Sequence, residues 1–129
     1  MRRWAVTPIP KLKSIEDLKA YAKTVSVGRP GKTVLSVGTA TCGIAAGGRE
    51  AIDALNAAIK ANHLKDIEVV ETGCLGFCYA EPLVEVRAPD AASVYYAGVT
   101  EDIAKKIIED HIVRGLIVEA ALLSKEVPR

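Results

Sequence analysis

The sequence has almost no net charge, and this lack argues against two classes of partner. Lysine and arginine together number 17, aspartate and glutamate 16, and the basic residues are scattered along the 129-residue chain. Binding to nucleic acid or to an anionic membrane surface depends on clustered positive charge, so neither is indicated. The sequence also lacks an apolar run typical of a signal peptide or a membrane-spanning helix, so we expect a cytoplasmic protein.

Cysteine is scarce as well, and the chain contains only Cys42, Cys74 and Cys78. An odd number of cysteines, in a protein expected to stay in a reducing compartment, does not suggest a disulfide framework. Cysteines in such proteins more often bind metals or act in catalysis. Half of the residues are hydrophobic, which is enough to form the core of one globular domain.

Two glycine-rich turns contain the three cysteines. The first turn runs from Gly38 to Gly43 and includes Cys42. The second includes Cys74 and Cys78, which are separated by three residues, whereas thioredoxin redox pairs and zinc knuckles have two residues between their cysteines. Glycine allows each turn to be tight and exposes backbone N–H groups. Because each turn follows a predicted strand, we expect one site assembled between the two turns.

Hydrophobic periodicity predicts an α/β domain with a mixed four-stranded sheet and flanking helices. The expected helices span residues 14–25, 51–62 and 100–115, and the expected strands span residues 33–37, 67–71, 83–86 and 93–97. A right-handed β-α-β crossover makes the first two strands parallel, and the last two strands form a hairpin. This is a thioredoxin-like arrangement. It places both cysteine turns at the carboxyl ends of strands, where open α/β sheets carry their sites.

Changes in composition divide the chain into three parts. Residues 1–31 are predicted to form an N-terminal arm and a short helix, residues 32–118 the thioredoxin-like domain, and residues 119–129 a C-terminal tail. The arm and the apolar residues near the C-terminus exceed what a minimal domain of this kind needs. Exposed apolar surface often marks an interface, so we expect both segments to contact a partner protein.

Three thiols in glycine-rich turns are typical of an iron–sulfur centre, which needs thiolates, backbone N–H donors to sulfur and partial shielding from water. The predicted metal ligands are Cys42, Cys74 and Cys78. The residues expected to surround the cluster are Gly38, Thr39, Gly43, Gly73 and Gly76. A [2Fe–2S] cluster usually has four protein ligands, and the fourth is not visible as a cysteine. Ser36, Thr39 and Thr41 lie close enough in sequence to offer an oxygen.

The residues alone leave three other interpretations of the cysteines open. The cysteines could be small buried hydrophobic residues, Cys74 and Cys78 could form a reversible disulfide, or the three thiols could bind zinc together with water or the Glu81 carboxylate. The disulfide is disfavoured because the turn has no lysine, arginine or histidine to lower a thiol pKa. His63 and His111 lie on predicted helices away from the turns, so a surface or packing role is favoured over cluster ligation.

Three stretches of the sequence resemble the thioredoxin-like [2Fe–2S] ferredoxin family. They are residues 37–50, 72–86 and 96–115, and together they place the resemblance over roughly residues 33–118. Within the family the chain looks most similar to the small second subunit of NADP-reducing iron-only hydrogenases. Cys42, Cys74 and Cys78 match three of the family's four cysteine ligands, and Val37 stands where the family has the first.

The resemblance implies an electron-transfer subunit, not itself catalytic, of a multi-subunit NAD(P)-linked oxidoreductase of the hydrogenase type. Its [2Fe–2S] cluster would relay electrons among the flavin-containing and iron–sulfur-containing subunits of the complex. Because Val37 has no ligand atom, the alternative is a structural or docking subunit that keeps the fold and carries no cluster.

Overall fold

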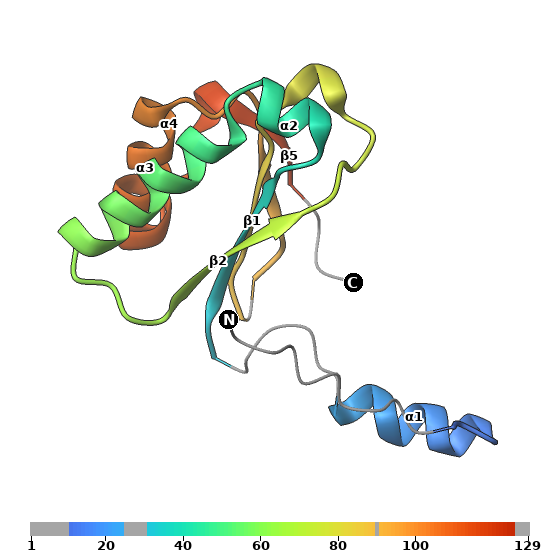
Figure 1. The fold of residues 1–129 in the computed structure, drawn as a ribbon. Helices are drawn as coiled ribbons and strands as arrows, with labels where there is room; N and C mark the ends of the chain where they lie inside the picture. Colours follow the sequence, from blue (N-terminus) through green and yellow to red (C-terminus); the bar gives the residue numbers. More distant parts are fainter. Residues whose placement is uncertain (1–10, 25–30, 90, 126–129) are drawn as a thin grey trace, which may run out of the picture.

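Alternating apolar residues form the five strands of one mixed sheet (Figure 1). The computed structural model describes residues 11–24, 31–89 and 91–125. Within them the strands are β1 (Thr33–Gly38), β2 (Ile67–Thr72), β3 (Val84–Arg87), β4 (Val94–Tyr96) and β5 (Leu122–Lys125). Their order across the sheet is β2-β1-β3-β4-β5, so β1 lies inside the sheet and β2 at one edge.

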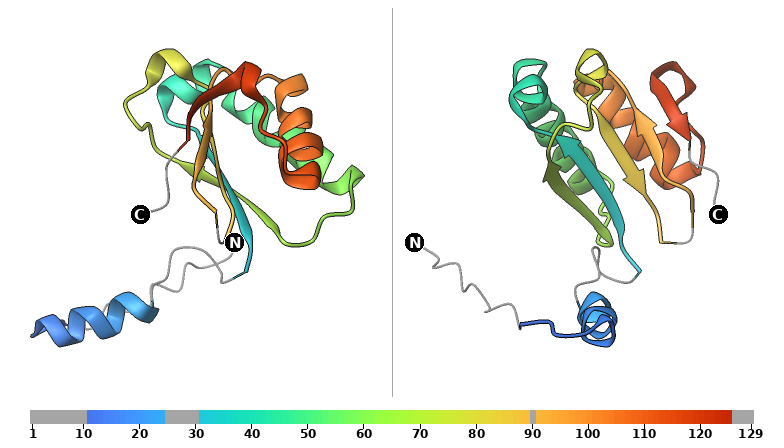
Figure 2. Two further views of the ribbon diagram at one scale, coloured as in Figure 1. Left: turned by 180° about the vertical axis from the view of Figure 1, so that it is seen from behind. Right: turned by 90° about the vertical axis from the view of Figure 1, so that its right-hand side faces the viewer.

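The longer helices of the domain lie together on one face of the sheet (Figure 2). The helices are α2 (Thr41–Ala45), α3 (Gly48–Ala61) and α4 (Glu101–Lys106), and α4 continues directly into the π-helix η2 (Ile107–Val113). The short 3₁₀ turns are η1 (Cys78–Ala80) and η3 (Glu119–Ala121). As the sequence predicts, Thr100 caps α4, and its hydroxyl accepts a hydrogen bond from the Ile103 N–H at 3.4 Å.

Strand pairing confirms both predictions about direction. β1 runs parallel to β2, in a register from Thr33–Ile67 to Gly38–Thr72. β3 and β4 form the expected antiparallel hairpin, and β3 also pairs antiparallel with β1. The carboxyl ends of the parallel neighbours β1 and β2 therefore lie side by side, and each leads into a turn that contains cysteine.

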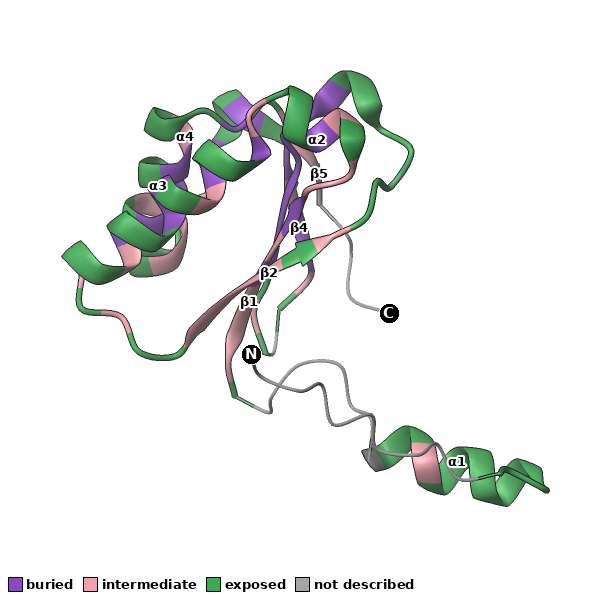
Figure 3. Cartoon of the chain, in the orientation of Figure 1, coloured by how far each residue is buried: buried purple, intermediate pink, exposed green. Residues whose placement is uncertain are grey.

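The hydrophobic core lies between the sheet and α3, α4 and η2. Alternate residues of the strands point toward these helices, because successive side chains of a strand face opposite sides. The largest fully buried side chains of this core are Leu35, Val37, Leu55, Val84, Val86, Tyr96, Val99, Ile107 and Ile108. Purple segments in Figure 3 show this buried layer where the helices meet the sheet.

The prediction of four strands is wrong by one, because β5 extends the sheet beyond β4. Its pairing with β4 is irregular between Tyr95 and Tyr96. Just before it, the Ala97 N–H donates to the Ala121 carbonyl at 2.8 Å. Val118 and Ala121 are buried in the core. Residues 118–125 therefore belong to the domain rather than to an exposed tail, while residues 126–129 lie outside the described part.

Helix α1 (Ile15–Thr24) lies apart from the sheet and is exposed along most of its length (Figures 1 and 3). Its start is the one the sequence predicts: Ser14 Oγ accepts from the Asp17 N–H at 3.1 Å, and Asp17 Oδ2 accepts from the Ser14 N–H at 3.2 Å. Ile15 and Leu18 are exposed. Residues 1–10 of the predicted arm lie outside the described residues, so the partner-binding role of the arm stays a prediction.

No helix in the described part of the chain has the length and apolar character needed to cross a membrane.

The sheet face opposite α3 and α4 holds a polar cluster around Glu85. Glu85 lies on β3 in register with Ser36 and Tyr95, and its side chain is buried. The carboxylate accepts hydrogen bonds from Arg87 Nη2 at 2.9 Å and from Ser93 Oγ at 2.8 Å. An ion pair and a hydroxyl thus compensate the burial of this charge.

Tyr96 connects β4 to the segment that precedes β5. Its hydroxyl accepts from the Val118 N–H at 3.3 Å and lies 2.8 Å from His111 Nδ1. Burial raises the pKa of Tyr96, so the hydroxyl stays protonated and forms a hydrogen bond with Nδ1 whose direction depends on the histidine tautomer.

Replacing Tyr96 with phenylalanine should therefore destabilise the domain without unfolding it. The Tyr96→Phe chain loses both contacts of a fully buried hydroxyl, so we expect its free energy of unfolding to fall by about 1–3 kcal/mol in chemical denaturation. Tyr95→Phe is the matched control, because the Tyr95 hydroxyl lies on the other face, 3.4 Å from Glu85, and should contribute less. Equal losses in the two variants would contradict this assignment.

Candidate metal centre

The two cysteine turns meet at the carboxyl ends of β1 and β2. Cys42 is the second residue of α2, which follows β1, and Cys74 lies just beyond the end of β2. Cys78 is the first residue of η1. Because β1 and β2 are parallel neighbours, the residues after both strands lie side by side. This confirms the prediction of one site built from two turns.

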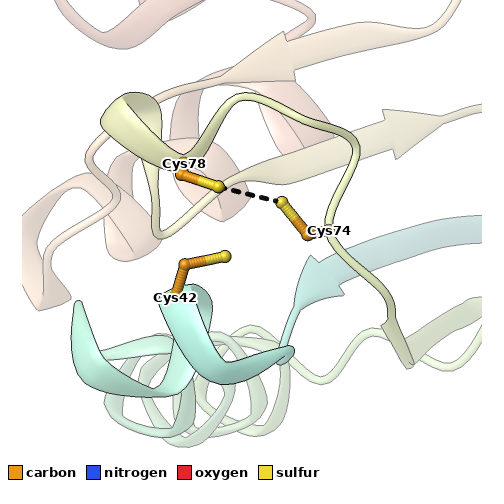
Figure 4. A group of neighbouring side chains, drawn as sticks. All are labelled: Cys42, Cys74 and Cys78. Carbon is orange, nitrogen blue, oxygen red and sulfur yellow. Dashed lines mark hydrogen bonds between the residues drawn. The ribbon is translucent and has the colours of Figure 1, made fainter.

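The three thiols point toward one another (Figure 4). All three Sγ atoms lie within 4.8 Å of one another, and the Cys74 and Cys78 Sγ atoms are 3.4 Å apart. All three cysteines are free thiols; Cys42 is partly buried, and Cys74 and Cys78 are exposed. Exposure excludes the interpretation of Cys74 and Cys78 as small core residues. The arrangement instead offers three sulfur ligands to a common metal group.

Gly76 orients one of these sulfurs. Its backbone N–H donates a hydrogen bond to Cys74 Sγ at 3.3 Å, as expected for a backbone donor beside a metal-binding thiolate. Gly76 adopts φ of +90°, a conformation that side chains with Cβ rarely adopt. A Cβ at Gly73 would meet no atom within 4 Å, and no positive φ requires glycine there. The structure therefore requires glycine at position 76, while the predicted role of Gly73 beside the cluster stays a prediction.

The glycines of the first turn serve close packing. A Cβ on Gly38 would lie 2.6 Å from Glu81 Oε2, and a Cβ on Gly43 would collide with the Gly38 carbonyl. A Cβ on Gly48 would lie 2.7 Å from that same carbonyl. These contacts bring the starts of α2 and α3 against the end of β1. A role of Gly38 and Gly43 in cluster binding stays a prediction, since none of their described contacts is with a thiol.

Thr39, Ser36 and Glu81, three of the oxygen ligands suggested by the sequence, have other surroundings. Thr39 donates its hydroxyl to Glu71 Oε2 at 3.1 Å. Ser36 lines a small cavity near Glu85, together with residues of β2 and of the second turn. Glu81 is buried and does not belong to the group of converging ligand atoms. Among the histidine, cysteine, aspartate and glutamate side chains of the described part of the chain, only Cys42, Cys74 and Cys78 converge in this way.

The donor set fits an iron–sulfur group in its chemistry. It offers three thiols, a backbone N–H donated to sulfur and a partly buried ligand, Cys42. Val37, which stands where the resemblance implies a fourth cysteine, is fully buried in the core. A cluster with four protein ligands would therefore need one ligand besides the three thiols.

Hydrogen bonds shift the pKa values of the Cys74 and Cys78 thiols in opposite directions. The Gly76 N–H, with hydrogen bonds from Cys42 and Cys78, lowers the pKa of Cys74, and burial and the negative charge of Glu81 oppose this in smaller part. Hydrogen bonding to Cys74 and Cys42 raises the pKa of Cys78 to about 11. Cys74 is therefore more easily ionised than Cys78.

The two cysteine turns carry an apolar rim. We give this name to four exposed side chains of the two turns: Ile44, Leu75, Phe77 and Tyr79. Phe77 and Tyr79 pack edge to face, with ring centroids 6.3 Å apart. Neither turn, over residues 38–48 and 72–82, contains lysine or arginine, and the single acidic residue, Glu81, is buried. The sequence analysis missed this rim, although apolar residues inside glycine-rich turns, outside any helix or strand pattern, are a usable signal.

Comparison with known proteins finds a hydrogenase subunit and a ferredoxin. The chain is 36% identical over 114 residues to the NADP-reducing hydrogenase subunit HndB of Solidesulfovibrio fructosivorans, which covers 86% of this chain and 90% of that protein. A thioredoxin-like [2Fe–2S] ferredoxin from Aquifex aeolicus matches with a TM-score of 0.63 and 25% identity, over 75% of this chain and 94% of the ferredoxin. A crystal structure of its wild-type form matches 73% of this chain, again with a TM-score of 0.63. No family model matches.

The reduced, metal-free chain should react with iodoacetamide at Cys74 before Cys78. The thiolate is the nucleophile, and at about pH 8 the lowered pKa of Cys74 favours its ionisation, while the pKa of Cys78 is raised to about 11. With limiting reagent, tandem mass spectrometry of the tryptic peptide 66–87 locates the first modification. Preferential labelling of Cys78 would contradict the direction of these shifts.

Proposed function

Because the chain belongs to the thioredoxin-like [2Fe–2S] ferredoxin family, we propose that it is an electron-transfer subunit of an NAD(P)-linked oxidoreductase of the hydrogenase type. The observation that carries the proposal is the convergence of Cys42, Cys74 and Cys78 from two turns. A [2Fe–2S] cluster bound there supplies one-electron chemistry. The proposed subunit is not itself catalytic, since its role needs a held redox group and a docked partner.

Each residue of the site has a role in this proposal. The three cysteines bind the cluster, and the Gly76 N–H stabilises negative charge on Cys74 Sγ. The apolar rim offers an apolar surface that a partner subunit could cover together with the exposed thiols of Cys74 and Cys78. The fourth ligand is a hydroxyl such as that of Thr41, the first residue of α2, or a residue of a neighbouring subunit.

The proposed partners are the flavin-containing and iron–sulfur-containing subunits of a cytoplasmic complex. The chain's relative HndB is a hydrogenase subunit, which supports a role within a larger assembly. The apolar rim suits a lasting contact, because exposed apolar side chains gain most when a partner covers them. Charge-steered encounter is not supported, since the two turns have no exposed charged side chain.

A cluster-free docking subunit is the second candidate. The observation that favours it is Val37, whose buried side chain occupies the position of the family's first ligand. Under this alternative the chain keeps the fold and the apolar rim, contributes to assembly, and carries no redox group.

Installing a fourth cysteine tests which candidate holds. Val37→Cys places a small, weakly polar side chain in a buried position, which the core should tolerate. After anaerobic reconstitution we expect about two irons per chain, held more stably against a chelator than in the parent chain. Val34→Cys is the matched control, because it adds a thiol to the same strand on the opposite face. If Val37→Cys stays iron-free with all its thiols reactive, the docking alternative is correct.

Removing the apolar rim should weaken assembly rather than folding. Phe77 and Tyr79 are 43% and 82% exposed, so the Phe77→Ser/Tyr79→Ser chain should unfold at the same denaturant concentration as the parent. In the native host, we expect the tagged variant to retain about tenfold less flavin and iron from its complex. Val113→Ser, which changes an exposed apolar residue of η2, is the control. Undiminished flavin and iron in the double variant would exclude the rim as the contact surface.

A further inference from the structure

Glu81 is a buried carboxylate between the two cysteine turns. It is 9% exposed and lies between η1 and β3. Its Oε2 accepts the Leu83 N–H at 2.7 Å. On the other side, the carboxylate lies so close to Gly38 that a Cβ there would be 2.6 Å from Oε2, and a Cβ on Gly43 would be 3.4 Å away. The charge therefore lies against the backbone of the turn that contains Cys42.

No cation balances this charge in residues 11–24, 31–89 and 91–125. The ion pairs found there join Glu85 to Arg87, Glu101 to Lys105 and Asp110 to Arg114. A buried carboxylate without a cation is costly, because the lost hydration is not replaced by an ion pair. Glu85 provides the contrast: it is as deeply buried and has Arg87 at 2.9 Å. The unbalanced charge of Glu81 lies instead beside the thiol site.

Glu81 lies near the thiols without joining them. It follows Cys78 by three residues, and its carboxylate lies close to Gly43, the neighbour of Cys42. The carboxylate is absent from the group of converging ligand atoms, so it is not a ligand in this arrangement. Gly38 and Gly43 lack the side chains that would displace it from this position.

We infer that Glu81 is a charge-setting residue of the thiol site, which strengthens the binding of cations there and lowers the reduction potential of the bound redox group. A negative charge in a partly desolvated place attracts a metal cation and opposes the addition of an electron. The effect on cation binding depends only on the three thiols. The effect on the reduction potential also rests on the proposed [2Fe–2S] function.

Glu81→Gln separates charge from structure. Glutamine keeps the size of the side chain and an oxygen that accepts the Leu83 N–H, but it removes the charge. Glu85→Gln is the matched control, since it removes the charge of an equally buried but ion-paired carboxylate. Glu81→Asp keeps the charge and shortens the side chain. Denaturant unfolding of all three variants identifies any loss of stability.

The first measurement uses Co²⁺ alone, added without oxygen to the reduced, metal-free full-length chain. The three Sγ atoms lie within 4.8 Å of one another. Small side-chain movements would bring them to the separation of about 3.8 Å that one ion with tetrahedral metal–sulfur bonds of about 2.3 Å requires. Thiolate-to-cobalt absorbance reports binding. We expect Glu81→Gln to raise the dissociation constant about tenfold, with little change in Glu85→Gln and Glu81→Asp. Equal dissociation constants for Glu81→Gln and the parent, or an equal loss in Glu81→Asp, would overturn the inference.

The second measurement is the midpoint potential of the reconstituted protein, titrated by visible absorbance. We expect the potential of Glu81→Gln to be higher than that of the parent and that of Glu85→Gln to be unchanged. A purely structural role for Glu81 would alter unfolding and leave the potential where it is. If no variant accepts a cluster while the Co²⁺ affinities differ as expected, the proposed function fails and the inference about Glu81 stands. An unshifted potential in a loaded Glu81→Gln chain overturns the inference.

Discussion

Backbone hydrogen bonds between β1 and β2 hold the two strands parallel, from the Thr33–Ile67 pair to the Gly38–Thr72 pair. The thiol site depends on this pairing, because each strand leads directly into a cysteine turn. If β1 and β2 were antiparallel, the two turns would lie at opposite ends of the strands. The crossover helix α3 makes the parallel arrangement possible and covers the core face of both strands. Sheet topology therefore brings together cysteines that are more than thirty residues apart in the sequence.

Close packing of backbone against backbone then fixes the positions of the two cysteine turns. The contacts among Gly38, Gly43 and Gly48 set α2 and α3 directly on the end of β1, which fixes the place of Cys42. The same lack of side chains leaves room for the Glu81 carboxylate beside the turn. Small residues near a metal site are easily interpreted as groups that face the metal. In this protein the glycines of the first turn mainly pack backbone against backbone, and the N–H donor to sulfur comes from Gly76 in the second turn.

The sequence is sufficient to predict the features that depend on local pattern. Apolar residues alternate or form short runs in β1 and β2, and Thr100 is a recognisable helix cap. These elements, and with them the proximity of the two cysteine turns, are therefore predictable. The features that depend on distant neighbours are not. The short strand β5 has no clear alternation and forms because β4 offers an unpaired edge. The burial of Glu81 follows from its contact with Gly38, which is far away in the sequence.

The central claim is that the three thiols hold a [2Fe–2S] cluster in the assembled protein. The most direct test is to purify the tagged chain with its partners from its own host without oxygen. Iron and acid-labile sulfide are then counted, and the electron paramagnetic resonance spectrum of the reduced chain is recorded after its release from the partners. We predict about two irons and two sulfides per chain, a signal of one reduced cluster, and loss of both in a Cys74→Ala chain. A chain that assembles with its partners but contains neither iron nor sulfide would contradict the account.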